Sequence, residues 1–200
     1  MFTEDLITAR QNDDKLKDSK YEREIITSAE CSVIEFQTVL FDGCRFIECD
    51  FTKSAFYDCK FLHCDLSNCK MPDSYWKNCE IEGCKCNGID FTKSGFKQTV
   101  FKNNSLVYGL FSECDFSGGS FISCDLSNAL LSQVKLRRIQ FNECRLISAE
   151  LFRTNLKGID LSDCDISGIV VSDTFQELRG LEVSYSQAAE LAVLLGIKIK

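Results

Sequence analysis

The chain has 200 residues, of which 23 are basic and 30 are acidic, giving a formal net charge of −7. This length suits one domain or one elongated array, and a hydrophobic content of 44% is enough for a continuous core. The acidic balance argues against a nucleic-acid-binding protein, which usually presents a basic face, and no apolar run is long enough for a transmembrane helix.

Residues 1–25 precede any clear pattern. The opening stretch MFTEDLITARQNDDKLKDSK lacks the basic and apolar regions of a secretory signal peptide. We therefore expect a cytoplasmic protein whose 13 cysteines are mostly reduced. The segment forms either a short helical cap led by Phe2, Leu6 and Ile7 or a loose tail.

A strict five-residue repeat follows this segment. Apolar residues occupy every fifth position from Phe36 to Val171, with no insertion and no charged residue among them. The residue two places earlier is small or apolar in every repeat except the one with Asn104. Alternate side chains of a strand face the same way, so both residues point inward. A period of five then requires a turn after each short strand, which predicts a closed coil, or β-helix, over residues 26–175.

The number of sides in each coil follows from residues of one kind that stack. At a period of twenty, one inward column reads Cys44, Cys64, Cys84, Asn104, Cys124, Cys144 and Cys164. Another column contains Ser54, Ser74 and Ser94, and no column is as uniform at a period of fifteen. We predict four sides and about seven coils, which make a rod roughly 35 Å long at about 4.8 Å per coil.

The repeat units CDFTK, CDLSN and CDFSG resemble the consensus A(D/N)LXX of the pentapeptide-repeat family. The resemblance covers residues 26 to about 175. It implies an all-β fold, a right-handed quadrilateral β-helix, between a terminal segment at 1–25 and a C-terminal cap at 176–200.

The C-terminal stretch VSYSQAAELAVLLGIKIK predicts a short α-helix. Ser184 followed by Gln187 suits a capping box, and Gly196 suits a helix end. One apolar stripe at helical spacing contains Ala188, Leu191, Ala192 and Leu195. This stripe either plugs the end of the coil or makes a dimer contact beyond the plug.

The end of the chain, SQAAELAVLLGIKI, also resembles the C-terminal tail of the Qnr-type members of this family. Those members are acidic rods that mimic DNA, dimerise through this tail, bind DNA gyrase and topoisomerase IV, and confer fluoroquinolone resistance. The unbroken frame leaves no room for the projecting loops that several of them carry, which puts quinolone protection in question. The resemblance implies a homodimer interface formed by Ala188, Leu191, Ala192, Leu194 and Leu195.

Two surfaces are candidates for partner binding. Acidic residues occur in two stretches without intervening bases, and either mimic DNA or merely solvate the coil. The candidates in these stretches are Glu113, Asp115, Asp125, Asp160, Asp163 and Asp165. Outward apolar residues Tyr108, Leu110 and Leu130 form a second candidate surface, either for a partner or for packing of the N-terminal segment.

The sequence does not predict catalysis. The cysteine spacings follow the repeat rather than a metal-binding motif, so the thiols are interpreted as small buried hydrophobes. His63 is the single histidine and faces outward in the frame. We therefore expect no enzyme activity, no metal site and no cofactor.

The preferred hypothesis is a dimeric, DNA-mimicking protein that binds a type II topoisomerase (DNA gyrase or topoisomerase IV). Binding would alter the activity of that enzyme or its fluoroquinolone sensitivity, without direct contact with nucleic acid or membrane. The alternatives are a structural or scaffolding rod with an unrelated protein partner, or an immunity factor against another gyrase-directed toxin.

Overall fold

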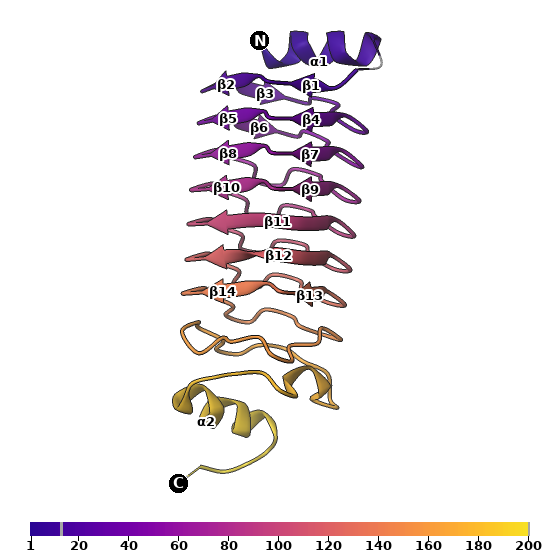
Figure 1. Cartoon of the computed structure of the whole chain (residues 1–200). Coiled ribbons are helices and arrows are strands. Elements are labelled where there is room, and N and C mark those ends of the chain that lie inside the picture. Colours follow the sequence, from indigo (N-terminus) through magenta and orange to yellow (C-terminus); the bar gives the residue numbers. More distant parts are fainter. Residues whose placement is uncertain (13, 200) are drawn as a thin grey trace.

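A computed structural model describes residues 1–12 and 14–199 as a rod of stacked turns with a helix at each end (Figure 1). The described residues form three helical segments: α1 (Phe2–Gln11), the short 3-10 helix η1 (Gln176–Leu178) and α2 (Tyr185–Leu194). The strands are β1 (Leu16–Lys17), β2 (Lys20–Glu22), β3 (Ile25–Thr27), β4 (Glu35–Gln37), β5 (Leu40–Asp42), β6 (Arg45–Ile47), β7 (Ala55–Tyr57), β8 (Lys60–Leu62), β9 (Tyr75–Lys77), β10 (Glu80–Glu82), β11 (Gly95–Lys102), β12 (Asp115–Ile122), β13 (Lys135–Arg137) and β14 (Gln140–Asn142).

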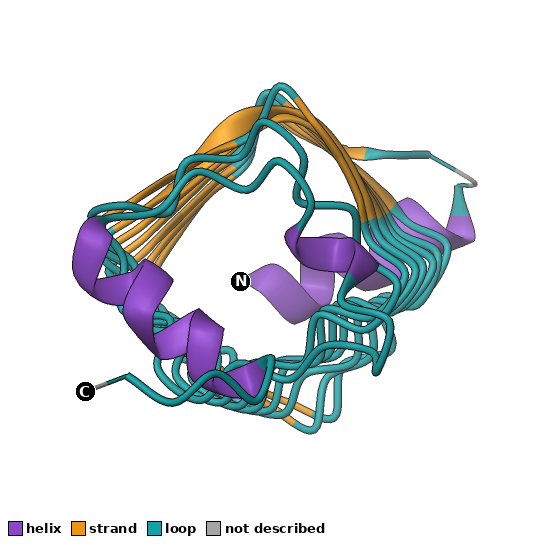
Figure 2. Ribbon diagram, turned by 90° about the horizontal axis from the view of Figure 1, so that it is seen from below, coloured by secondary structure: helices purple, strands orange, loops and turns teal. Residues whose placement is uncertain are grey.

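Each turn of the rod takes twenty residues, as the stacked columns predict. All strand pairs are parallel, and their registers join residues such as Phe36 to Phe56 and Phe41 to Phe61. Most strands belong to a 12-stranded sheet, and β3 pairs with β6 in a second, 2-stranded sheet. Seen along its axis, the rod has a four-sided outline (Figure 2). The predicted quadrilateral β-helix with a C-terminal helix is confirmed.

The corners of the coil explain how the chain can turn after every five residues. At most corners the residue two places after the buried centre has a positive φ, for example 55° at Thr38, 64° at Gly43 and 53° at Glu48. This left-handed conformation turns the chain before the next short strand begins. Most corners are not glycine, so the fold tolerates a conformation that costs L-residues roughly 1–2 kcal/mol each.

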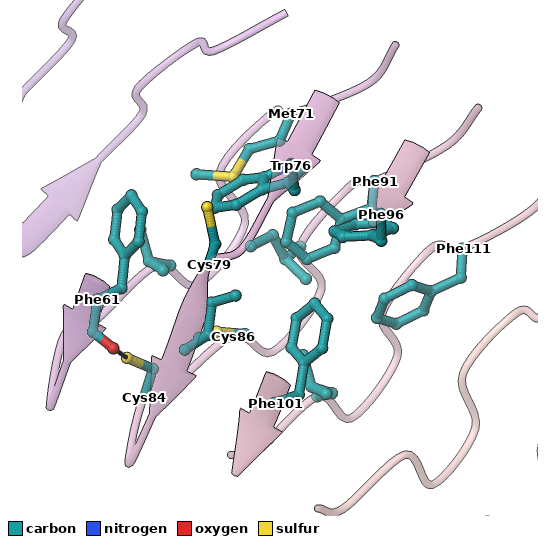
Figure 3. Close-up of a cluster of buried hydrophobic side chains, with 14 of the residues drawn as sticks. Phe61, Met71, Trp76, Cys79, Cys84, Cys86, Phe91, Phe96, Phe101 and Phe111 are labelled. Carbon is teal, nitrogen blue, oxygen red and sulfur yellow. Dashed lines mark hydrogen bonds between the residues drawn. The ribbon is translucent and has the colours of Figure 1, made fainter. Parts of the chain in front are cut away.

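The core is a column of aromatic rings along the axis. Trp76 is fully buried and stacks on Phe56 with ring centroids 3.9 Å apart, while Phe96 stacks on Phe116 at 4.6 Å. Figure 3 shows Trp76, Phe96 and Phe101 among the buried side chains that successive turns contribute to this core. Because many rings pack on a ring of the neighbouring turn, such as Phe101 on Phe121 at 4.7 Å, a side of the coil cannot shift its register without losing core contacts.

The small inward residues form ladders that bind neighbouring turns. Cys84 donates its thiol to the carbonyl of Phe61 at 3.3 Å, and its backbone N–H donates to the side-chain oxygen of Asn104 at 2.8 Å. Ser74 and Ser94 share a hydrogen bond of 3.0 Å. Within the described chain, every buried side-chain nitrogen or oxygen has a hydrogen-bond partner. The column predicted from Cys44 to Cys164 is therefore a real stack.

The N-terminal end is closed by helix α1, so the alternative of a loose tail is excluded. Phe2 is fully buried and Leu6 nearly so, whereas Ile7 is 51% exposed and does not contribute to the cap. The N-terminus lies inside the four-sided outline in Figure 2. Phe2 plugs the axis, with its ring 5.5 Å from that of Phe41.

The coil also begins earlier than residue 26, because β1 at Leu16 already pairs with β4. Glu24 occupies the small inward position two residues before Ile26, where a charged residue is not expected. The cap resolves this conflict: the Glu24 carboxylate accepts the backbone N–H of Phe2 at 3.0 Å. A charge at the top of the column is thereby satisfied by the helix above it.

At the other end the five-residue frame fails at Gln176, as the sequence predicts. Segment 176–182 still covers the preceding turn, but Asp160 now bridges to Glu182 rather than to a residue twenty positions on. Glu177 is buried there and accepts hydrogen bonds from the Arg153 N–H and the Ser172 hydroxyl, both at 2.8 Å. No helix of the described chain is long and apolar enough to cross a membrane.

Candidate partner-binding surfaces

The four sides of the rod differ in charge. We call the side with buried centres Phe36, Phe56 and Trp76 the first side, and the next three in chain order the second, third and fourth sides. On the described first side, seven bases and two acids flank the buried centres. The bases are Lys15, Lys17, Lys77, Lys97, Lys135, Arg137 and Lys157.

Both acids of the first side are paired with bases of the same side. Glu35 lies 3.5 Å from Lys15, and Asp115 binds the guanidinium of Arg137 at 2.6 Å. By contrast, the fourth side carries Glu30, Asp50, Asp90 and Glu150 in one ladder, with Lys70 as its one base among the described flanking positions. The rod therefore has a basic side in an otherwise acidic protein.

The predicted acidic residues do not form one surface. Asp115 lies on the first side, Asp160 on the second, and Asp125 and Asp165 on the third. Arg145 stands between Asp125 and Asp165 in their ladder, which alternates in sign. Glu113 and Asp163 occupy corners of the coil between these sides.

Two of these carboxylates are held by local hydrogen bonds. The backbone N–H of Ser162 donates to Asp160 at 2.9 Å, and hydrogen bonds from Ser162 lower the pKa of that carboxyl. Ser167 does the same for Asp165 through its N–H and its hydroxyl, and the pKa of Asp165 is lowered. These acids therefore stay ionised, and they also brace their turns.

The predicted apolar residues do stack on one side. Leu110 and Leu130 bridge each other on the fourth side, and Tyr108 at the neighbouring corner is 63% exposed. The alternative that they seat the N-terminal segment is wrong, because α1 closes the far end of the rod (Figure 1). A surface role for these residues stays a prediction.

Helix α2 divides its apolar residues between the rod and solvent. The capping box predicted at Ser184 and Gln187 is present. The residue that enters the coil is Gln187, whose amide donates to the carbonyls of Leu161 at 2.8 Å and Cys164 at 2.6 Å. Leu191 packs partly against the core.

The other predicted dimer residues are not part of this plug. Ala192 is half-buried, whereas Ala188 is exposed, and Leu194 and Leu195 are 42% and 53% exposed. Val193 and Ile197 add exposed apolar surface to the same end of the chain. The stripe from Ala188 to Leu195 therefore does not plug the coil as a unit, and part of it faces solvent.

The thiols lie inside the coil. All 13 cysteines are free and buried. Burial raises the pKa of Cys69 and Cys114 to about 12 and that of Cys86 further, which keeps these groups protonated. His63 is exposed, with its Nδ1 3.5 Å from Asp42. Among the described residues, no three His, Cys, Asp or Glu side chains are grouped as metal ligands would be.

Comparison with known proteins identifies the repeat. Residues 34–111 match the family described as pentapeptide repeat region, and residues 96–133, 110–146 and 130–168 match pentapeptide repeats. The chain belongs to the pentapeptide-repeat family. A search of curated protein sequences found no match.

Solved structures of other pentapeptide-repeat proteins are similar to this one. A trypsin-treated variant of QnrB1, a plasmid-mediated fluoroquinolone resistance protein, is 20% identical with a TM-score of 0.57, over 93% of this chain and 98% of that one. HetL from Nostoc sp. strain PCC 7120, involved in regulation of heterocyst differentiation, is 12% identical with a TM-score of 0.32, over 88% and 92% of the two chains. At these identities the likeness to QnrB1 supports the fold.

The basic first side of this pentapeptide-repeat protein was missed by reading charges along the chain. Its signal was present, because folding the charges at twenty aligns Lys77 with Lys97 and Arg137 with Lys157. Linear clusters of acids are misleading in this family, because successive repeats face different sides of the rod.

Proposed function

We propose that this protein binds a type II topoisomerase, DNA gyrase or topoisomerase IV, and modulates its activity or its fluoroquinolone sensitivity. The observation that carries the proposal is the likeness to QnrB1 along nearly the whole of both chains, since QnrB1 is a fluoroquinolone resistance protein. Fluoroquinolones act on type II topoisomerases, so a binding partner of that class links the fold to the resistance.

Shape and charge support a DNA-mimicking mode of binding. The coils form a straight rod that rises about 4.8 Å with each twenty-residue turn (Figure 1). The second and fourth sides carry an excess of acids, and these are the sides that a basic DNA-binding surface would attract. Attraction between such surfaces steers association and weakens as salt rises. The basic first side would face away from the enzyme.

A homodimer would double the length of this surface. Leu194, Leu195 and Ile197 are exposed beyond the plug formed by Gln187, so two C-terminal ends can meet without opening the coil. The pair would carry twice −7, or −14, in formal charge. Substituting Leu194→Asp and Leu195→Asp should give a monomer in light scattering, while Ile7→Asp at the other end should not. A wild-type monomer, or a dimer that survives both substitutions, contradicts this interface.

The enzymatic test is a supercoiling assay with purified gyrase, titrated with this protein in the presence and absence of ciprofloxacin. We expect a change in supercoiling or in drug-induced cleavage at micromolar protein. The charge-reversal variant Asp50→Lys/Asp90→Lys should reduce the effect, whereas Lys77→Glu/Lys97→Glu should not. No effect of the wild-type protein on either readout would refute the proposal.

One observation favours a second candidate, a scaffolding rod with an unrelated partner. A continuous basic side is not a feature that a DNA mimic needs. The scaffold function would replace the topoisomerase proposal on two results. Neither charge-reversal variant would change the effect on gyrase, and a different protein would bind to the first side. An immunity factor against another gyrase-directed toxin would instead protect gyrase from that toxin and not from ciprofloxacin.

A further inference from the structure

The wall of the coil opens on the first side near the C-terminal end. Two adjoining grooves lie there, one of about 470 Å³ and one of about 850 Å³. Arg153, Asn155 and Lys157 line both grooves and form the strip between them. These volumes fall in the range of about 300–1,000 Å³ that small-molecule sites occupy.

The grooves arise where the regular stacking stops. In the described chain, β13 pairs with β12 above it but with no strand below it. On the far side of the strip the pairing also changes: the Arg153 N–H donates to the Glu177 side chain at 2.8 Å, whereas the equivalent Gln133 N–H donates to the backbone carbonyl of Phe152. Contact resumes where the Leu156 N–H donates to the carbonyl of Glu177 at 3.2 Å. The opening is thus built into the backbone, and Leu136 is only half-buried at its inner wall.

The groove lining is strongly cationic. Five bases line the grooves, and all are exposed: Lys135, Arg137, Arg153, Lys157 and Arg179. Arg137 is paired with Asp115, whereas the other four make no ion pair with any described residue.

The two acids of the lining do not cancel this charge. Glu177 is buried and spends its carboxylate on the Arg153 N–H and the Ser172 hydroxyl. Asp173 is exposed at the rim of the larger groove. Four unpaired cations therefore face one exposed carboxylate in this part of the rod.

Two of the cations are held in place by their surroundings. The guanidinium of Arg153 lies over the ring of Phe152, 5.2 Å from its centroid. The stem of Lys157 passes over Gly180, where an added Cβ would lie 3.0 Å from Cγ of the lysine. A side chain at position 180 would push Lys157 aside, so this glycine keeps the lysine against the groove.

We propose that these grooves bind a small ligand with two or more linked phosphate groups, of the pyrophosphate or nucleoside diphosphate class. Arginine forks and lysine ammonium groups are the usual partners of phosphate oxygens. The side-chain amide of Asn155 lines the same space and can donate to a further phosphate oxygen. A long nucleic acid fits less well, because the acidic second and fourth sides flank the basic one and would repel it.

The test uses the full-length protein and calorimetric titration with inorganic pyrophosphate at low and at physiological salt. We expect saturable binding with one ligand per chain, weakened by salt, and weaker binding of inorganic phosphate. The variant Arg153→Glu/Lys157→Glu should weaken binding by about tenfold or more, because it reverses two groove cations.

The matched control is Lys93→Glu/Lys97→Glu, which makes the same charge change at the same two register positions in an earlier turn, outside the grooves. It should leave the affinity within about twofold, since exposed charges more than a Debye length away are largely screened. A parallel titration with ADP distinguishes the source of the phosphates: tighter binding than pyrophosphate indicates a nucleotide, and equal binding indicates the phosphates alone.

Three outcomes would overturn the proposal. The first is no saturable binding of pyrophosphate at low salt. The second is an equal loss of affinity in the groove variant and in the control, which would reduce the effect to the general charge of the first side. The third is a duplex oligonucleotide that displaces pyrophosphate and whose binding is weakened by both the Arg153/Lys157 and the Lys93/Lys97 substitutions.

Discussion

Removing the Phe2 side chain should unseal the N-terminal end of the rod. The ring is fully buried and lies 5.2 Å from that of Tyr21, 5.5 Å from that of Phe41 and 6.2 Å from that of Phe46. A buried Phe→Ala substitution costs about 3–5 kcal/mol. In a solenoid each turn contacts only its neighbours, so we expect this loss to fall on the first turn rather than on the whole rod.

Native-state hydrogen exchange measures this directly. The amides of Arg23 and Ser28 donate to the next turn at 2.8 Å and report opening of the first one. At about 1.4 kcal/mol per factor of ten, their exchange should accelerate roughly a hundred- to a few thousandfold in Phe2→Ala. Asn128, in a central turn, should keep its protection.

The control is Ile7→Ala on the solvent side of the same helix, since Ile7 is 51% exposed. It should leave the exchange of Arg23 and Ser28 within a few-fold of wild type. Unchanged exchange in Phe2→Ala, or equal acceleration in Phe2→Ala and Ile7→Ala, would refute the view that one buried ring seals the coil. Equal acceleration in Asn128 would refute local opening.

Three other substitutions test different parts of the account. The pKa of the Glu177 carboxyl is lowered: burial alone would raise it, but hydrogen bonds from its own N–H, Ser172 and Arg153 outweigh that effect. The ionised Glu177 carboxylate therefore stabilises the fold above an unfolded pKa of about 4.3, and this stabilisation is lost as pH falls through the lower folded pKa. The difference in melting temperature between wild type and Glu177→Gln should shrink in acid. A difference that stays constant with pH would contradict this. Gly119→Ala should lower the free energy of unfolding by several kcal/mol, because the new Cβ would lie 2.0 Å from the carbonyl oxygen of Thr99. A typical overpacking substitution costs about 1–3 kcal/mol. A denaturant titration that shows no loss of stability would disprove the clash. Val33→Asn should stabilise by about 1 kcal/mol, because Val33 is a β-branched residue at φ 64° with a side chain 74% exposed, and an unchanged melting temperature would indicate that this corner carries no strain.

The architecture could be predicted because every repeat has the same pattern of apolar and small residues. The apolar residue at each fifth position, the small residue two places earlier and the stacked column from Cys44 to Cys164 all agree on one register. The two ends could not be predicted in the same way, because each is closed by a contact outside the frame. Glu24 fits only because α1 lies above it, and Gln187 enters the coil through hydrogen bonds that no apolar pattern reveals.

The candidate surfaces depended on which side of the rod each repeat faces. Asp160, Asp163 and Asp165 are close in sequence, yet the chain turns a corner between them and distributes them over two sides and that corner. The basic first side is the converse case, since Lys77 and Lys97 are remote in sequence but adjacent in the sheet. In this β-helix, charges that are twenty residues apart share a side of the rod and have to be compared with one another.

The most direct test of topoisomerase binding is competition with DNA on purified gyrase. Fluorescently labelled duplex DNA bound to gyrase is titrated with this protein, and anisotropy reports the displaced DNA at several salt concentrations. We expect full displacement at low salt, with weaker competition as salt rises and with Asp50→Lys/Asp90→Lys. DNA that stays bound at saturating protein, or displacement that is indifferent to both salt and the charge reversal, would contradict the account.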